Sequence, residues 1–217
     1  MRVHLPDCWR LLHGSTAVGI AVTLSTVIPR LDVIVLSLIA GAAMAGVFAA
    51  AQTGVVIVYL LSSLLASVLF PQMTRLVRTP EELRQYVRHW TMISVGVMVP
   101  GSLFAIAIGP SLVWTLFGHA FEASGGLLSI MLIAAPLIVL NALNLHHAFA
   151  LNQVRSYLGI YIGATVAAVF LDAVLANKFG ASGIAVAVVI RECLVFAGFQ
   201  VLRNAPQPLA PAPDTGF

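Results

Sequence analysis

Five charged side chains lie inside segments of the sequence that are otherwise almost free of charge. Arg30 and Asp32 occupy one long apolar segment, Asp172 a second, and Arg191 and Glu192 a third. A charged side chain at the centre of a membrane-crossing helix costs about 2.5 to 3.5 kcal/mol on insertion scales. Such residues usually face a bundle interior or a hydrated cavity, and they mark a substrate or ion pathway.

Two interpretations of these charges stay open at this level. In the first, they line a hydrated cavity whose arginines bind an anionic head group, phosphate above all. In the second, they form interhelical ion pairs that fix the packing, such as Arg30–Glu192 and Asp32–Arg191. Residues one or two positions apart on a helix do not face each other. We therefore expect Arg30 and Asp32 to contact different partners, and the same for Arg191 and Glu192.

Weaker polar signals occur in two further apolar segments. Interhelical hydrogen bonds between such side chains contribute about 0.6 kcal/mol each, so most of these residues are expected to join helices, although some can line a cavity. Adjacent histidines project about 100° apart on a helix and make a poor chelate without a third ligand, so no metal site is predicted. The residues concerned are Gln52, Thr53, Asn141, Asn144, His146 and His147.

The motifs of common enzyme classes do not appear in the sequence. We find no nucleophile elbow, P-loop, dinucleotide fingerprint or metal-ligand set. The sequence therefore predicts neither enzyme activity nor an organic cofactor.

The composition indicates an integral membrane protein. Of 217 residues, 60% are hydrophobic and only 9% are charged, whereas globular domains carry about 25% charged residues. The mean hydropathy is +1.00. Positions 33–74 carry no charge, which is enough for two helical crossings joined by a turn. A small basic excess is better explained by anchoring at the cytoplasmic membrane surface than by nucleic-acid binding.

The predicted fold is all-α, with six transmembrane helices in one bundle. A polar lead (1–12) precedes the transmembrane domain (13–203), and a proline-rich tail (204–217) is expected to be disordered. Kinks are expected at Pro29, Pro100 and Pro136. Thr79-Pro80-Glu81-Glu82 is typical of a helix start. The expected crossings are about 14–40, 46–70, 90–116, 126–150, 155–176 and 182–202, and the most charged loop, 71–89, joins the second to the third.

The distribution of basic residues predicts the orientation. With six crossings, the sequence places a single Lys or Arg outside the membrane on one side, Lys178. Because cytoplasmic loops carry the excess of Lys and Arg, both termini are expected in the cytoplasm. Cys8 and Cys193 fall far apart in this topology and are not expected to pair. The basic residues on the predicted cytoplasmic side are Arg2, Arg10, Arg75, Arg78, Arg84, Arg88, Arg155 and Arg203.

Several segments resemble the seventh and later helices of bacterial polysaccharide exporters. These exporters are the lipid-linked oligosaccharide (O-antigen type) flippases of the multidrug/oligosaccharidyl-lipid/polysaccharide superfamily, which act in lipopolysaccharide synthesis. The order and spacing of the segments carry the resemblance more than any one of them. The segments are RLDVIVLSLIAG (30–41), AGVFAAA (45–51), FPQMTRL (70–76), FGHAFEA (117–123) and LANKFGASGIA (175–185).

This resemblance implies half of a 12–14-helix flippase in the bacterial inner (cytoplasmic) membrane. Such flippases have two six-helix halves around a central cavity, so this C-terminal half is expected to pair with a second half or with a copy of itself. The implied substrate is an undecaprenyl-pyrophosphate-linked oligosaccharide, with Arg30 and Arg191 as candidates for binding the pyrophosphate. The other cavity candidates are Asp32, Gln52, Asn141, Asn144 and Glu192.

Coupling to Na⁺ or H⁺ is left open by the same resemblance. Related lipid II flippases bind sodium between helices equivalent to the first and fifth here, which makes Asp32 with Asp172 a candidate ion site. Two other functions remain: a multidrug/cation antiporter-type half, in which acidic residues would dominate the cavity, and a non-transporting membrane module or truncated gene product.

Overall fold

A computed structural model describes the backbone of residues 5–204. Between residues 5 and 29, surface exposure is described only for Thr16, Gly19, Thr23 and Val27. The described chain is helical almost throughout and contains no strand. The predicted tail therefore lies outside the described residues, apart from Asn204. The helices are α1 (Leu5–Leu76), α2 (Pro80–Phe117), the short 3₁₀ helix η1 (His119–Phe121), α3 (Glu122–Leu132), α4 (Ala135–Ala150), α5 (Val154–Phe179) and α6 (Ala181–Asn204).

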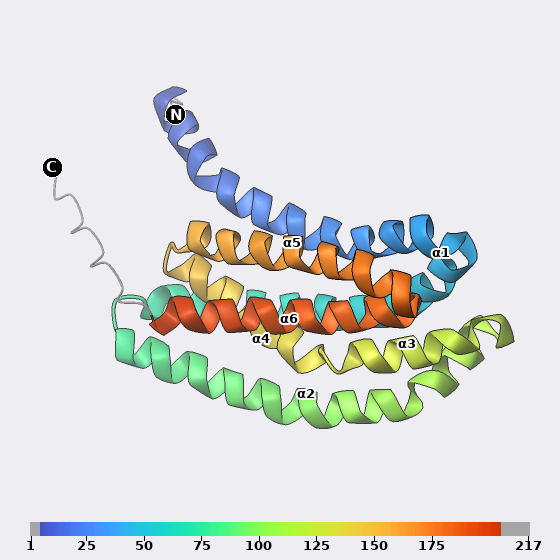
Figure 1. The fold of residues 1–217 in the computed structure, drawn as a ribbon. Helices are drawn as coiled ribbons and strands as arrows, with labels where there is room; N and C mark the ends of the chain where they lie inside the picture. Colours follow the sequence, from blue (N-terminus) through green and yellow to red (C-terminus); the bar gives the residue numbers. More distant parts are fainter. Residues whose placement is uncertain (1–4, 205–217) are drawn as a thin grey trace, which may run out of the picture.

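Helix α1 is broken at Gly41, which has φ 84° and ψ 168°. Glycine tolerates this positive φ without the steric cost that a side chain would add. A straight helix of 72 residues would be about 108 Å long, several times the thickness of a bilayer core. Figure 1 shows that the chain reverses near this break and returns along the bundle. We call residues 5–40 the first arm of α1 and residues 42–76 the second arm.

The predicted helix end near 70 is wrong, because the second arm continues through Pro71 to Leu76. Pro71 removes only its own backbone donor, and the turn after it is held because Met73 is fully buried in a cluster of apolar side chains from α1, α2 and α4. The predicted start of α2 is confirmed, with Pro80 in the first turn beside Glu81 and Glu82.

The predicted fourth crossing begins earlier than expected and is divided into α3 and α4. The two helices meet at Ile133–Ala134 and are bent by 50°. Pro136 has no N–H to donate to the carbonyl of Leu132, so the helical ladder is interrupted where the sequence predicts a kink. Helix α2, in contrast, continues as a helix through Pro100 and Pro110.

The helices form an antiparallel bundle whose outer surface is apolar. Helix α5 packs along α6, α1 packs against α4 and α5, and α2 packs against α3 and α4. Many large apolar side chains point outward, and Leu38, Phe170 and Val201 are each more than 70% exposed. Within the described residues four helices are long and apolar enough to cross a membrane, or five if α3 and α4 make one bent crossing. The chain is therefore a helical membrane protein.

Small residues allow close packing between α2 and α3. A Cβ atom added to Gly125 would lie 2.6 Å from the Cα of Pro110, whereas one added to the neighbouring Gly126 would meet nothing within 4 Å. Gly125 is buried and Gly126 is exposed. The α2–α3 contact thus depends on the missing side chain at position 125.

We predict that Gly125→Ala lowers the stability of the purified protein by about 1 to 3 kcal/mol, because backbone atoms of α2 must move to admit the methyl group. Gly126→Ala is the matched control and should be neutral or stabilising, since alanine favours a helix. Thermal unfolding in detergent, followed by circular dichroism, measures both. Equal melting temperatures for the two variants would contradict the close contact.

Candidate functional site

An ion pair between Asp32 and Arg191 lies in the interior of the bundle. The Nη1 atom of Arg191 donates to both carboxylate oxygens of Asp32, at 3.1 Å each. Asp32 belongs to the first arm of α1 and is fully buried, and Arg191 lies near the middle of α6 and is 3% exposed. Charge-assisted hydrogen bonds of this kind are stronger than those between neutral groups. The pair joins two helices that are 159 residues apart in sequence.

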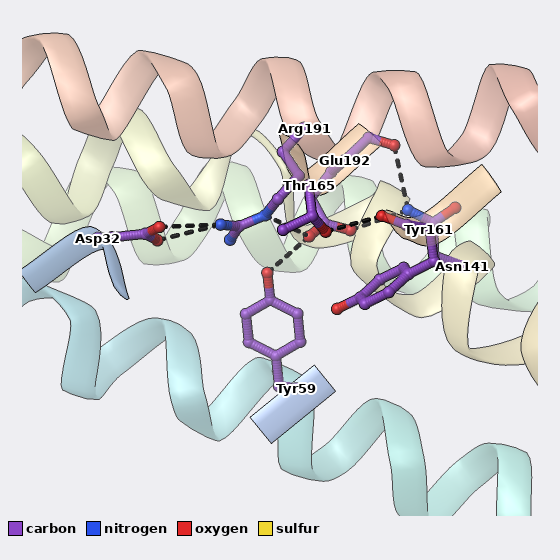
Figure 2. A network of polar contacts seen from close by, with 7 residues as sticks. All are labelled: Asp32, Tyr59, Asn141, Tyr161, Thr165, Arg191 and Glu192. Carbon is purple, nitrogen blue, oxygen red and sulfur yellow. Dashed lines mark hydrogen bonds and ion pairs between the residues drawn. The ribbon is translucent and has the colours of Figure 1, made fainter. Parts of the chain in front are cut away.

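Glu192 is held by neutral donors from two other elements. The hydroxyl of Tyr59, on the second arm of α1, donates to Oε1 at 2.7 Å. Asn141 of α4 donates from Nδ2 to Oε2 at 2.8 Å and to the backbone carbonyl of Glu192 at 3.1 Å. Arg191 Nε lies 3.8 Å from Oε1. Figure 2 shows these side chains converging from α1, α4 and α6, with the ring of Tyr161 beside Asn141.

Asp172 adds a third carboxyl group to this interior. It is 1% exposed and its Oδ2 has no hydrogen-bond partner. Its side chain lies close enough to Asp32 for a hydrogen bond between the two carboxyl groups when one of them carries a proton. Among the buried residues that the structure describes, three acidic groups thus accompany the single guanidinium of Arg191. We call Asp32, Tyr59, Asn141, Asp172, Arg191 and Glu192 the buried polar network.

One of the two ion pairs considered from the sequence is present and the other is not. Asp32 pairs with Arg191, but Glu192 contacts Tyr59 and Asn141 instead of Arg30. Arg30 is exposed and forms no ion pair with any residue that the structure describes. Arg30 therefore shares no partner with Asp32. Arg191 and Glu192 have different hydrogen-bond partners, although Arg191 Nε also lies 3.8 Å from Oε1 of Glu192.

The weaker polar signals are distributed between the network and the surface. Asn144 is buried one helical turn after Asn141, and its Nδ2 has no partner. Gln52 is partly buried, and the exposed Thr53 donates its hydroxyl to the carbonyl of Ala49. His146 and His147 each contact an aromatic ring, of Phe70 and Phe199 respectively. Among the side chains that the structure describes, no group of three or more His, Cys, Asp or Glu could hold a metal ion.

Tyr59 was not among the site residues predicted from the sequence, although it holds Glu192. A tyrosine in the middle of a long apolar helix was the available signal, because a buried tyrosine hydroxyl normally finds a partner. Which partner it finds depends on the second arm of α1 returning beside α6. The adjacent Tyr161 was missed for the same reason.

The fold and the network define a helical membrane protein with a charged interior, a pattern typical of transport proteins. The model of the family described as polysaccharide biosynthesis protein matches residues 2–125, more than half of the chain. The protein therefore belongs to the polysaccharide biosynthesis protein family. The matched segment includes Arg30, Asp32 and Tyr59 and ends within α3. No curated protein and no solved structure matches the chain.

We predict that Asp32→Asn destabilises the protein by about 3 to 5 kcal/mol, because the buried guanidinium of Arg191 loses the carboxylate that accepts its two short hydrogen bonds. The double variant Asp32→Asn/Arg191→Gln should recover part of this loss, since it removes the buried guanidinium as well and leaves Glu192 held by Tyr59 and Asn141. Arg30→Gln is the control at an exposed position and should change the stability by less than about 0.5 kcal/mol. Thermal unfolding in detergent measures the stability of all three variants. A double variant less stable than Asp32→Asn would contradict this explanation of the loss.

Proposed function

We propose that this protein moves a lipid-linked oligosaccharide or polysaccharide precursor across the bacterial inner membrane and is not an enzyme. In this proposal it is the C-terminal half of a flippase of the multidrug/oligosaccharidyl-lipid/polysaccharide superfamily. Membership of a polysaccharide biosynthesis family supports the substrate class. The apolar helices and the charged interior support transport within the membrane.

The exposed position of Arg30 is the observation that carries this proposal. Arg30 lies two residues, or about 3 Å along the helix axis, from Asp32. Asp32 pairs with Arg191, which is near the middle of α6. Arg30 is therefore at a similar depth, near the middle of a crossing helix, yet it points away from the buried network. Lipid tails would make this charge costly, so its face is expected to meet water, a head group or a partner.

The chemistry of arginine suits a pyrophosphate head group. The guanidinium presents a planar set of donors that matches phosphate oxygens in a bidentate geometry. The exposed side of the second arm adds small and hydroxyl-bearing residues, among them Thr53, Ser63 and Ser67. Their hydroxyls donate to carbonyls of their own helix. Large apolar side chains such as Leu60 and Val68 are exposed on the same arm.

The proposed topology has six crossings, with each arm of α1 crossing once. In Figure 1 the α1–α2 connection, the α4–α5 turn and the end of α6 lie at one end of the bundle. The exposed Arg75, Arg78, Arg84, Arg88, Arg155 and Arg203 belong to these segments, which supports placing this end and both termini in the cytoplasm. Transport would proceed by alternating access, with the breaks at Gly41 and Ile133–Ala134 as bending points.

Asp32 and Asp172 are the candidates for binding a coupling ion, Na⁺ or H⁺. Arg191 can neutralise only one of the buried carboxylates, and Asp172 keeps an oxygen without a partner. A cation or a proton between these two carboxyl groups would remove a buried charge. In this scheme Arg191 holds Asp32, and Arg30 is left to bind the head group.

A multidrug/cation antiporter-type half is the second candidate function. The excess of buried carboxyl groups over buried arginine favours it, because such a protein binds cations. The exposed arginine on α1 favours an anionic substrate instead. A non-transporting membrane module is the third candidate, and no contact in the described structure specifically supports it.

We predict that Arg30→Gln abolishes or strongly reduces translocation of a pyrophosphate-linked lipid oligosaccharide without reducing the amount of folded protein, because Arg30 makes no internal ion pair. Arg155→Gln, at an exposed position in the first turn of α5, is the matched control. A fluorescent or radiolabelled substrate in proteoliposomes reports the rate. Full activity in Arg30→Gln would overturn the head-group assignment, and transport of organic cations without lipid oligosaccharides would favour the antiporter.

We also predict that the native protein, extracted in mild detergent, has a mass larger than one 22.9 kDa chain. A half-transporter needs a second six-helix half, or a copy of itself, to close a cavity around Arg30. Native mass spectrometry measures the assembly. A monomer in every mild detergent and in nanodiscs would count against a working half-transporter and in favour of a non-transporting module.

A further inference from the structure

Two buried polar atoms on α4 lack hydrogen-bond partners, and one of them belongs to Asn141, which contacts Glu192. Asn141 uses its Nδ2 on Glu192, but its Oδ1 is buried and unpaired, and Asn144 Nδ2 is also buried and unpaired. Both residues are more than nine-tenths buried, at 6% and 8% exposed. An unmatched buried polar atom costs about 1 to 3 kcal/mol, and a bound water with several partners removes this cost.

Further polar residues follow these two asparagines along α4 toward the end of the bundle. Asn141, Asn144 and His147 are each three residues apart, so that each lies beside the next on the helix surface. His147 is partly buried against Phe199 of α6. Helix α4 ends at Ala150, and the turn after it carries the exposed Asn152. Polar side chains therefore recur along α4 between the contact of Asn141 with Glu192 and the α4–α5 turn.

The groups around Glu192 come from every helix packed near it. Tyr59 of α1 and Asn141 of α4 donate to it directly, and Arg191 lies at 3.8 Å. Tyr157 and Tyr161 of α5 are near enough to interact with its charge. Beyond these lie the carboxyl groups of Asp32 and Asp172, and Arg203 lies near His147.

From these contacts we infer that Glu192 exchanges a proton with the solvent at the α4–α5 turn through water held by Asn141 and Asn144. In uptake, a hydronium ion transfers its proton to a Glu192 carboxylate oxygen: one O–H bond of the hydronium breaks, one O–H bond forms on the carboxyl, and a water molecule remains. Release is the reverse. This inference rests on the proposed function only for the transport step that the proton would drive. It assigns Glu192 a role separate from that of Asp32 and Asp172.

Asn141 is suited to both protonation states of Glu192. With the carboxylate, Nδ2 donates to Oε2, as observed. A half-turn of the amide would bring Oδ1 to Oε2, where it could accept a hydrogen bond from the protonated carboxyl. That turn gives up the second bond of Nδ2, to the Glu192 carbonyl at 3.1 Å. Protonation also removes the negative charge that lies next to Arg191, so that Arg191 then interacts with Asp32 alone.

Infrared difference spectroscopy of the protein in nanodiscs tests this inference without any transport substrate. Lowering the pH should produce C=O bands of protonated, buried carboxyl groups. Glu192→Gln should remove the component that belongs to Glu192 and keep any component that belongs to Asp32 or Asp172. Glu82→Gln, at an exposed position in the first turn of α2, is the matched control and should keep the band. The amide I band in the same spectrum reports folding. An unchanged buried-carboxyl band in Glu192→Gln would overturn the assignment.

A second pair of variants tests the route. Asn144→Leu should leave the Glu192 band in place but slow its appearance after a pH jump, because the water next to Asn144 is lost. Asn177→Leu, at an exposed position near the other end of the bundle, should keep the wild-type rate. Equal rates in both variants would overturn the route. If Glu192→Gln fails to fold, Glu192→Asp carries the first test, with the expected loss of the wild-type band and a band at a shifted frequency.

These measurements separate the inference from the proposed function. Loss of the band in Glu192→Gln together with inactive proteoliposomes would support proton exchange and count against the flippase. A wild-type spectrum in Glu192→Gln together with active flipping would count against proton exchange by Glu192 and support the flippase.

Discussion

The ion pair between Asp32 and Arg191 is the contact on which the arrangement of the charged residues depends. It joins the first arm of α1 to the middle of α6 and buries both partners. With Asp32 turned inward, Arg30 must lie on the opposite side of its helix. With Nη1 of Arg191 directed at Asp32, Glu192 accepts its hydrogen bonds from Tyr59 and Asn141 instead. A buried pair gains little net stability, because desolvation offsets the attraction. Its value here is that it sets the orientation of two helices and of the residues beside it.

The charges divide into two groups with different environments. Inside the bundle, Asp32, Asp172 and Glu192 share one arginine and draw on neutral donors such as Tyr59. Outside it, Arg30 has no counter-charge among the described residues. An interior with excess negative charge favours protons or cations, whereas an exposed arginine favours an anion. A membrane protein that carries both can couple the movement of a cation to that of an anionic substrate, which is the arrangement that the proposed function requires.

The breaks in the helices allow side chains from distant parts of the chain to come into contact. Gly41 lets α1 reverse, so that its second arm brings Tyr59 to the network. The bend at Ile133–Ala134 separates α3 from α4, and the part that follows presents Asn141 to Glu192 and leaves Asn144 behind it. Apolar clusters with members on both sides of these breaks hold the helices together by side-chain packing.

Composition and the long uncharged segments were enough to predict a helical membrane protein, and helix geometry was enough to predict that Arg30 and Asp32 face different ways. The sequence also predicted the ion pair Asp32–Arg191, but it predicted a second pair, Arg30–Glu192, alongside it, and this second pair is not formed. The packing of α6 against α1 and α4 instead brought Tyr59 and Asn141 to Glu192. A separate apolar cluster around Met73 held the helical turn after Pro71. Local periodicity determines which face a residue occupies, whereas its partner depends on contacts between helices far apart in sequence.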